Sequence, residues 1–329
     1  MELNAHFKQT LTKLHDAVNR QLQAALVKKE PVSLYEPMRY TLFAGGKRLR
    51  PILLLLTTQA VGGNYRDALN AAVAVELLHN FTLIHDDVMD QDDTRRGQPT
   101  VHKKWDVDVA ILSGDGLVAL SYEYLLKTRY PAIDQLGQLF SRALLEVCEG
   151  QALDKDFESK TNVTPAEYFK MIQKKTAALL ALCCELGAHI GGADAETIAS
   201  LREFGLNLGM AFQIQDDLLD IISEEKQLGK TWGSDIKRKK KTLLLIQAKK
   251  LAGAANMAQI DAILNKESIS TADVTRMKKI FEDTGAVEYS RKLLARHFRR
   301  ARDCFKPISS ESGKALLTNL LETVVIRTN

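Results

Sequence analysis

The chain contains two aspartate clusters with the same spacing, Asp-Asp-x-x-Asp, and apolar residues flank both. In a helix, the first and last aspartates of such a cluster lie one turn apart on the same face, so each cluster predicts a pair of neighbouring carboxylates. Carboxylates among apolar residues are costly unless positive charge accompanies them. Mg²⁺ prefers oxygen ligands and commonly bridges carboxylates to substrate phosphates. We name these clusters the first claw, Asp86, Asp87 and Asp90, and the second claw, Asp216, Asp217 and Asp220.

A single cluster of this kind says little, because acidic residues are common near helix ends. Two clusters are more informative, since each ends a long and mostly apolar segment, residues 66–90 and residues 196–222. Helices that are apolar nearly all round lie inside a bundle. We therefore expect two core helices that point their claws into one cavity from opposite walls.

Basic residues accompany the claws. The segment GGKRLRP, residues 45–51, predicts a tight glycine turn followed by a helix with Pro51 in its first turn. Lys47 and Arg50 then lie at a loop-to-helix junction, where free backbone N–H groups and positive charge favour anions. Taken alone, the segment could also be an ordinary solvated turn. Further basic residues follow or separate the claws, which supplies enough positive charge for two diphosphates: Arg95, Arg96, Lys175, Lys230 and Lys240.

The overall composition favours helices. The chain has 329 residues, 45% of them hydrophobic, with only 7 Pro and 19 Gly, and no strand-like alternation of convincing length. No linker-like stretch divides it, so we expect one all-α domain over residues 1–329, a bundle of roughly ten or more helices. Apolar periodicity predicts helices over residues 1–28, 107–128 and 135–158, and Thr164-Pro165-Ala166-Glu167 has the pattern of a helix start.

The net charge and the cysteines indicate which compartment and which partners to expect. The net charge of +4 implies no particular partner, and four cysteines without a CxxC pair indicate a reduced, cytoplasmic compartment. We find no signal peptide and expect no transmembrane helix. The helix over residues 1–28 could touch a membrane, but packing on its own domain or on a partner subunit is favoured. The basic run at residues 237–241 could suggest nucleic acid binding, which is disfavoured here.

Together the motifs resemble the trans-isoprenyl diphosphate synthases, the head-to-tail polyprenyl synthetase family. The match runs from the GGKRLRP segment to at least Lys240. It rests on GGKRLRP, HNFTLIHDDVMD, DDTRRGQPT, the pair Lys175-Thr176, FQIQDDLLD, and a Gly-Lys followed by a Lys ten residues later. The resemblance implies an isoprenoid synthase fold with a central active-site cavity, and isopentenyl diphosphate and an allylic diphosphate as substrates. It also implies a homodimer, and Mg²⁺ as cofactor with three ions per active site.

The resemblance also implies roles for individual residues. Asp86, Asp90 and Asp216 would anchor Mg²⁺, with Asp87 and Asp220 supporting them. Isopentenyl diphosphate would be held by Lys47, Arg50, His79 and Arg96. The allylic diphosphate would be held by Arg95, Lys175, Thr176, Gln213, Lys230 and Lys240. The catalytic set would be Asp86, Asp90, Asp216, Arg95, Lys175 and Lys230.

One position departs from the family pattern. Lys239 stands where relatives often carry Gly, so the diphosphate ligand could be Lys239, Lys240 or Lys241. The spacing from Asp235 favours Lys240. His79 lies about two helical turns before Asp86 on nearly the same face; alone it would be read as a core histidine, and the resemblance makes it a ligand.

The resemblance implies the chemistry and a limit on product length. Loss of diphosphate from the allylic substrate leaves a cation, which the double bond of isopentenyl diphosphate attacks; no side-chain base is needed. In this family, bulk just before the first claw limits the product. Phe81 and the small Thr82 there, with no insertion in the claw, resemble enzymes that make geranylgeranyl diphosphate; farnesyl or longer-chain products are alternatives. Phe81 is rotated by about 140° from Asp86, so it could also be core packing.

Two other functions compete with chain elongation. A terpene cyclase would share the all-α fold and an aspartate-rich motif, but it needs no second substrate site. A non-catalytic partner subunit is the other alternative, and such subunits commonly lack an intact claw. Two intact claws and an expected isopentenyl diphosphate site favour a prenyltransferase without stable membrane anchoring.

Overall fold

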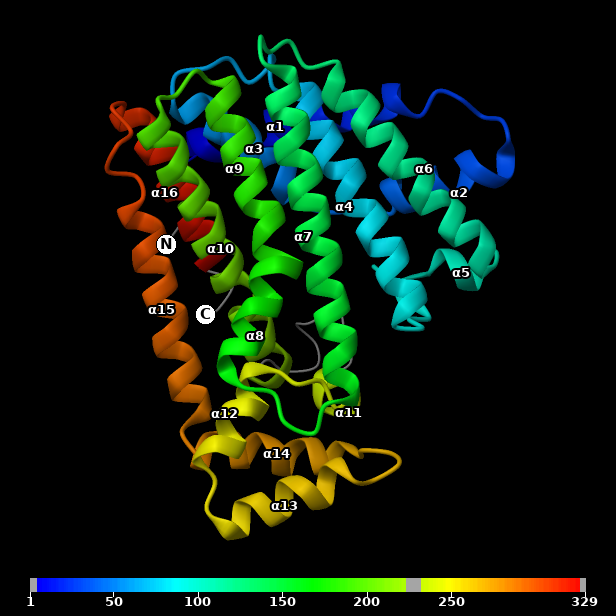
Figure 1. Ribbon diagram of the computed structural model, residues 1–329, viewed down its shortest axis with the longest axis vertical. Helices are drawn as coiled ribbons and strands as arrows, with labels where there is room; N and C mark the ends of the chain where they lie inside the picture. The colour runs from blue at the N-terminus through cyan, green and yellow to red at the C-terminus, as the bar shows by residue number, and fades with distance from the viewer. Residues whose placement is uncertain (1–4, 223–231, 326–329) are drawn as a thin grey trace. The chain divides into compact units, whose positions relative to one another are not determined.

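The chain is almost entirely helical. The computed structural model describes residues 5–222 and 232–325, and Figure 1 traces their helices in order. This confirms the expected all-α class. The helices are α1 Ala5–Ala25, α2 Val32–Phe43, α3 Leu49–Ala60, α4 Leu69–Met89, α5 Val101–Lys104, α6 Val107–Leu126, α7 Ile133–Ser159, α8 Pro165–Ile172, the π-helical turn η1 Gln173–Ala177, α9 Ala178–Ile190, α10 Ala195–Ile222, α11 Ser234–Lys237, α12 Leu243–Leu251, α13 Ala254–Leu264, α14 Thr271–Asp283, α15 Ala286–Asp303 and α16 Glu311–Val325.

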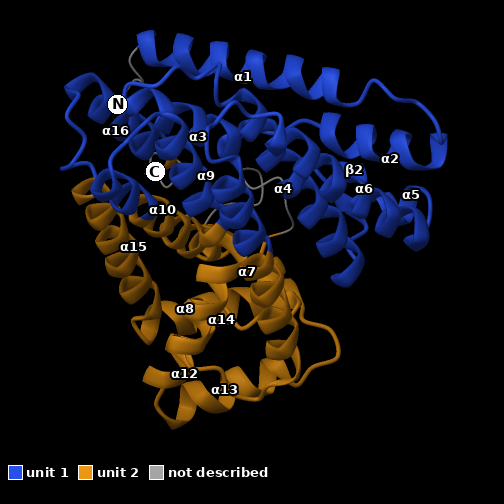
Figure 2. Ribbon diagram, turned by 45° about the horizontal axis from the view of Figure 1, so that its top comes forward, with its two compact units in different colours: residues 1–144, 179–202, 305–323 blue, residues 145–178, 203–304, 324–329 orange. Residues whose placement is uncertain are grey.

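The helices gather into two compact units, which Figure 2 colours separately. Unit 1 comprises residues 1–144, 179–202 and 305–323. Unit 2 comprises residues 145–178, 203–304 and 324–329. The boundaries fall inside α7, α9, α10 and α16, and one falls directly after α15. The first claw belongs to unit 1 and the second claw to unit 2, so their convergence on one cavity, like the single domain, stays a prediction.

The core of unit 1 forms around α4, because that helix is apolar on nearly every side. Residues Ala71–Leu78 of α4 are all buried, and α3, α6 and α1 pack against this helix. Gly114 of α6 allows the close approach, since a Cβ there would lie 2.2 Å from Nε2 of His85. The N-terminal helix buries Phe7, Leu14 and Leu22 in this unit, as the packing interpretation of residues 1–28 predicts.

Unit 2 contains the rest of α7 and α10 together with α8 and α11–α15. Helix α8 begins with the predicted capping box: the Thr164 side chain accepts from the backbone of Glu167, and Glu167 accepts from the backbone of Thr164. Pro165 occupies the first turn. The predicted helix start is therefore confirmed. The turn η1 follows α8 directly in the chain.

A short hairpin follows the first claw. Strands β1 Thr94–Arg95 and β2 Gln98–Pro99 pair antiparallel, with Thr94 opposite Pro99. The two turn residues, Arg96 and Gly97, have φ of 53° and 74°. Positive φ at both central residues is the geometry of a type I′ hairpin turn. The turn therefore holds Arg96 in one fixed backbone conformation beside the first claw.

Helix α6 differs from the other described helices in its composition. It alone among them is long and apolar enough, with a mean hydropathy of 1.3, to cross a membrane by length and composition. The core helices of water-soluble proteins pass the same test, and α6 packs against α4, α2 and α5. It also exposes four large apolar side chains, those of Val107, Ile111, Leu112 and Leu126.

Candidate active site

The first claw lies at the C-terminal end of α4. Asp90 is the C-cap residue, and its backbone N–H donates to the carbonyl of Asp86 at 2.8 Å. Carboxylates at this end face the negative pole of the helix dipole, which costs about 0.3–1 kcal/mol each unless a cation is near. Asp86 and Asp90 are partly exposed, whereas Asp87 is buried. The two outward carboxylates are therefore those that the i, i+4 spacing predicts.

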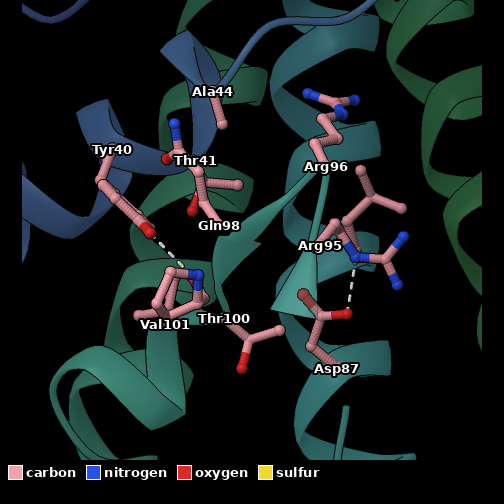
Figure 3. A pocket seen from close by; sticks show the side chains of 11 residues that line it. Tyr40, Thr41, Ala44, Asp87, Arg95, Arg96, Gln98, Thr100 and Val101 are labelled. Atoms are coloured by element: carbon pink, nitrogen blue, oxygen red, sulfur yellow. Dashed lines mark hydrogen bonds and ion pairs between the residues drawn. The ribbon is translucent and has the colours of Figure 1, made fainter. Parts of the chain in front are cut away.

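Asp87 makes an ion pair with the hairpin. Its Oδ1 accepts from Nε of Arg95 at 2.6 Å, and Figure 3 shows the two side chains facing each other while Arg96 points away. Burial raises the pKa of Asp87 to about 6, although Arg95 acts against this rise. Arg95 also lies 3.8 Å from Asp92. One guanidinium thus compensates the buried carboxylate only in part.

The four residues expected to hold isopentenyl diphosphate belong to unit 1, and the structure brings three of their segments together. Nη1 of Arg50 contacts Nε2 of His79 at 3.1 Å. Arg96 donates from Nη1 to the carbonyl of Gly45. Its guanidinium also lies against Gly46, where a Cβ would sit 3.1 Å from it. Lys47 is exposed in the same loop.

This cluster carries an excess of positive charge. Burial and then the neighbouring Arg50, Arg96, Arg95 and Arg48 hold the pKa of His79 well below its usual value. His79 is therefore neutral, and its Nε2 accepts from Arg50, which cannot act as an acceptor. Nε of Arg50 is buried without a hydrogen-bond partner among the described residues. Buried donors are normally paired, so this N–H remains able to serve an acceptor group of a ligand.

The second claw is organised differently. Asp216 is exposed near the end of α10, while Asp217 and Asp220 are buried. Asp217 accepts from the hydroxyl of Tyr168 at 2.6 Å and from Nε2 of Gln213 at 3.1 Å. Burial and then Asp235 raise the pKa of Asp217 to about 7. Asp217 therefore anchors α10 to α8 inside unit 2.

Asp220 is also bound within the protein. Its Oδ1 accepts from Oγ of Ser234 at 2.8 Å, and its Oδ2 accepts from the backbone of Asp235 at 3.2 Å. Of the six claw carboxylates, the three outside the buried set are Asp86, Asp90 and Asp216. They are the three that the family resemblance makes the principal metal ligands.

Three residues of the expected allylic diphosphate set lie together in unit 2. Oγ1 of Thr176 donates to Oε1 of Gln213 at 3.0 Å, and Gln213 continues to Asp217. Nζ of Lys175 pairs with Asp154 of α7 at 2.6 Å. Lys175 and Thr176 lie in the π-helical turn η1, a distortion that is frequent at functional sites.

Of the three candidate lysines after Asp235, the contacts of two differ from those expected of a diphosphate ligand. Nζ of Lys239 donates to the carbonyl of Lys266 at 2.7 Å, and its backbone has a φ of 54°. Lys241 lines a groove with residues of α12 and α13. The choice of Lys240 among the three stays a prediction. Lys230 lies outside the described residues.

The family assignment comes from comparison with known proteins. A family model described as Polyprenyl synthetase matches residues 31–283. The chain belongs to the polyprenyl synthetase family. The resemblance deduced from the motifs is therefore confirmed.

Individual members of the family are similar over almost the whole chain. The geranylgeranyl diphosphate synthase of Methanosarcina mazei is 38% identical over 312 residues, which are 94% of both proteins. The geranylfarnesyl diphosphate synthase of Natronomonas pharaonis is 35% identical over 341 residues, covering 98% of both. The crystal structure of geranylgeranyl pyrophosphate synthetase from Pyrococcus horikoshii Ot3 matches with a TM-score of 0.92 and 35% identity, covering 98% of both chains.

The donor chemistry of this family member fits Mg²⁺. The claws offer hard carboxylate oxygens at negative helix ends, where a cation is stabilising. Within residues 5–222 and 232–325, no group of three or more His, Cys, Asp or Glu side chains could by itself hold a metal ion. Mg²⁺ is commonly held by one or two carboxylates together with substrate phosphates and water, so it does not require such a group.

The region expected to limit product length lies on α4. The ring of Phe81 packs edge-on against His85, with 4.7 Å between the ring centres. Oγ1 of Thr82 donates to the carbonyl of His79 at 2.7 Å. Phe81 is only partly buried, so it is not a fully enclosed core residue.

Two glycines make room for the π-helical turn. A Cβ on Gly150 of α7 would lie 2.2 Å from the backbone nitrogen of Lys175. A Cβ on Gly209 of α10 would lie 2.4 Å from Cα of Ala177. The neighbouring helices therefore contact the backbone of η1 directly, and no larger residue fits without moving it.

This packing yields a prediction with a control on the same helix. We expect Gly150→Ala to lower the free energy of unfolding by about 1–3 kcal/mol, because the added methyl group overlaps the backbone of η1. The shift of Lys175 should also raise the KM for the allylic substrate. Gly137→Ala has nothing within 4 Å of its new Cβ and should stabilise α7 by about 0.5–1 kcal/mol. Urea unfolding and steady-state kinetics measure both; equal effects of the two variants would contradict the role of Gly150.

Proposed function

We propose that this polyprenyl synthetase condenses isopentenyl diphosphate with an allylic diphosphate, giving geranylgeranyl diphosphate. The observation that carries the proposal is the charge pattern of unit 1. There a cationic cluster with an unpaired buried donor, Nε of Arg50, accompanies the claw and is distinct from it. A second anionic substrate requires such a cluster, whereas a cyclase with one substrate does not. The relatives named above are synthases of geranylgeranyl and geranylfarnesyl diphosphate, which supports the same reaction class.

In the proposed reaction, the chain supplies binding and charge stabilisation. Lys47, Arg50 and Arg96 would hold the diphosphate of the isopentenyl substrate, with His79 orienting Arg50. Lys175, Thr176 and Gln213, with Arg95, Lys230 and Lys240, would hold the allylic diphosphate. Arginine offers a planar fork to phosphate oxygens, and lysine acts as a point charge.

The chemistry follows from where charge develops. Breaking the C–O bond of the allylic diphosphate puts negative charge on the leaving group, and fixed positive groups lower that barrier. Mg²⁺ held by Asp86, Asp90 and Asp216, with Asp87 and Asp220 supporting, would supply Lewis-acid neutralisation of the same charge when bound. The double bond of isopentenyl diphosphate then attacks the allylic carbon, and the departing diphosphate can accept the proton that is lost. Apolar walls protect the cation from water.

The proposed enzyme works in the cytoplasm as a homodimer. The four cysteines form no disulfide in the structure, which suits a reducing compartment. The exposed apolar side chains of α6 supply a surface for a second copy of the chain. Ile111 and Leu112 are neighbours in the sequence and are the centre of the proposed interface.

The metal-claw proposal predicts large losses at the outward carboxylates. Asp86→Ala and Asp216→Ala should each lower kcat on the order of 100-fold or more, because each removes a ligand that neutralises the leaving group. Asp93→Ala is the control, since Asp93 is exposed and pairs with Lys103 instead; it should stay near wild-type. Turnover of isopentenyl diphosphate with each allylic primer, with and without Mg²⁺, is the assay. Near-normal turnover of Asp86→Ala or Asp216→Ala would rule out the mechanism.

The same assay separates the competing functions. Release of diphosphate from one allylic substrate alone would indicate a terpene cyclase. A purified chain that is inert with every primer, and active only beside another subunit, would indicate a partner subunit.

Product length is tested at Phe81. If its ring ends the product cavity, Phe81→Ala should shift the product to longer chains, because removing the ring deepens the cavity. Chromatography of the dephosphorylated products measures the shift. Phe43→Ala, at an exposed phenylalanine of α2, should leave the product unchanged. An unchanged product of Phe81→Ala would make Phe81 ordinary packing.

The homodimer is tested on α6. Ile111→Glu combined with Leu112→Glu should halve the mass measured by light scattering, because two desolvated carboxylates would oppose association. Both side chains are exposed, 42% and 59%, so the fold of the single chain should persist. Val27→Glu, at a residue that is 71% exposed outside α6, is the control. A wild-type monomer, or a double variant of unchanged mass, would disprove this interface.

A further inference from the structure

The loop that carries Lys47 and Arg50 has a strained backbone at the residue between them. Arg48 is the N-cap of α3, with φ of 50° and ψ of 36° in the left-handed region. For a residue with a Cβ, this conformation costs about 1–2 kcal/mol. Gly45 and Gly46 also have positive φ, 91° and 137°. The loop shape therefore depends on interactions that hold Arg48 in place.

The side chain of Arg48 supplies those interactions and is itself buried. Nη1 donates to Oε1 of Glu76 at 2.7 Å, Nη2 to the carbonyl of Leu42 at 2.5 Å, and Nε to Oδ1 of Asn19 at 3.1 Å. These acceptors belong to α4, α2 and α1. One guanidinium thus joins three helices to the start of a fourth, α3.

Arg48 and Glu76 form a buried ion pair. Both side chains are only 3% exposed. Nδ2 of Asn80 adds a weaker donor to the same oxygen of Glu76 at 3.3 Å. Buried ion pairs are weak contributors to stability, since well-packed apolar residues can often replace both partners, whereas removing one partner is strongly destabilising. In some proteins such pairs serve to fix one particular geometry.

The Arg48–Glu76 ion pair joins the same two segments as the contact between Arg50 and His79. Glu76 lies three residues before His79 on α4, and Arg48 lies two residues before Arg50 in the chain. Residues three apart on a helix are neighbours on one face. The Arg48–Glu76 and Arg50–His79 contacts therefore connect the same two segments at two levels. The Arg48–Glu76 contact is buried. The Arg50–His79 contact involves the residue whose Nε has no hydrogen-bond partner among the described residues.

We propose that Arg48 and Glu76 are positioning residues that set the affinity for isopentenyl diphosphate. They hold the loop from Gly45 to Arg50 against α4, so that Lys47 and Arg50 present their charges in one geometry. They do not touch substrate themselves. The inference rests on the proposed function, because it takes this cluster to be the isopentenyl diphosphate site.

The test compares single and paired replacements. Arg48→Met and Glu76→Leu should each lower Tm, because each leaves one buried charge without its partner. The double variant should recover most of that loss. Its KM for isopentenyl diphosphate should still rise about tenfold, because small displacements of binding groups are costly, while the KM for the allylic primer stays near wild-type. Calorimetric titration with isopentenyl diphosphate alone should show the same loss without relying on turnover.

Two further variants sharpen the comparison. Arg48→Lys keeps the charge but loses the planar fork that serves three acceptors, so it should raise the same KM. The control is Arg202→Met combined with Glu185→Leu, which removes another ion pair of unit 1, at 3.4 Å, and should leave both KM values unchanged.

The outcomes separate the inference from the proposed function. A folded double variant, or a folded Arg48→Lys, with wild-type affinity for isopentenyl diphosphate would overturn the positioning role. An equal rise in both KM values would also overturn it, since it would mean a general disturbance. A wild-type protein that neither binds nor turns over isopentenyl diphosphate would instead refute the proposed function.

Discussion

Both claws place carboxylates at the C-terminal ends of long core helices, where the helix dipole is already negative. This arrangement opposes folding unless positive charge is close by. The protein's own residues stabilise the two middle carboxylates. Arg95 pairs with Asp87, and the Tyr168 hydroxyl and the Gln213 amide donate to Asp217. The outward carboxylates Asp86, Asp90 and Asp216 are hard oxygen donors at negative helix ends, which suits them to divalent cations and the phosphates that accompany them.

The cationic cluster of unit 1 shows the opposite imbalance. Several guanidinium groups surround a neutral His79, and Glu76, the acid that contacts Arg48, is already paired. Burial and then this positive charge hold the pKa of His79 well below its usual value, and Nε of Arg50 has no hydrogen-bond partner among the described residues. A cluster rich in positive charge and a claw rich in carboxylates thus occur in the same unit.

Much of the fold could be predicted from local sequence. Periodicity predicts α4, α6 and α10 within a few residues of their observed bounds, and the capping pattern at Thr164 marks the start of α8. The π-helical turn could not be predicted, because Lys174-Lys175-Thr176 reads as ordinary helix. Its backbone packs on Gly150, a contact between segments that local sequence does not show.

The candidate site shows the same division. The residues with distinctive types and spacing could be found from sequence, but the residues that hold them could not. Glu76 lies in a helix read as apolar, and its pairing with Arg48 exists only in three dimensions. Tyr168 likewise gives no sign in the sequence that its hydroxyl holds Asp217. In both cases the missing information is a contact between elements, which composition and periodicity do not encode.

The structure also shows that the aspartates of one motif are not equivalent. The middle residue of each claw is rotated by about 100° from the first, because one residue of a helix turns by that angle. Asp87 and Asp217 accordingly point inward, are both 4% exposed, and anchor their helices to Arg95 and Tyr168. In the second claw, Asp220 is also turned inward and bound by Ser234. A motif of three carboxylates is therefore best understood as outward ligands combined with inward anchors, and the anchors fix the direction in which the ligands point.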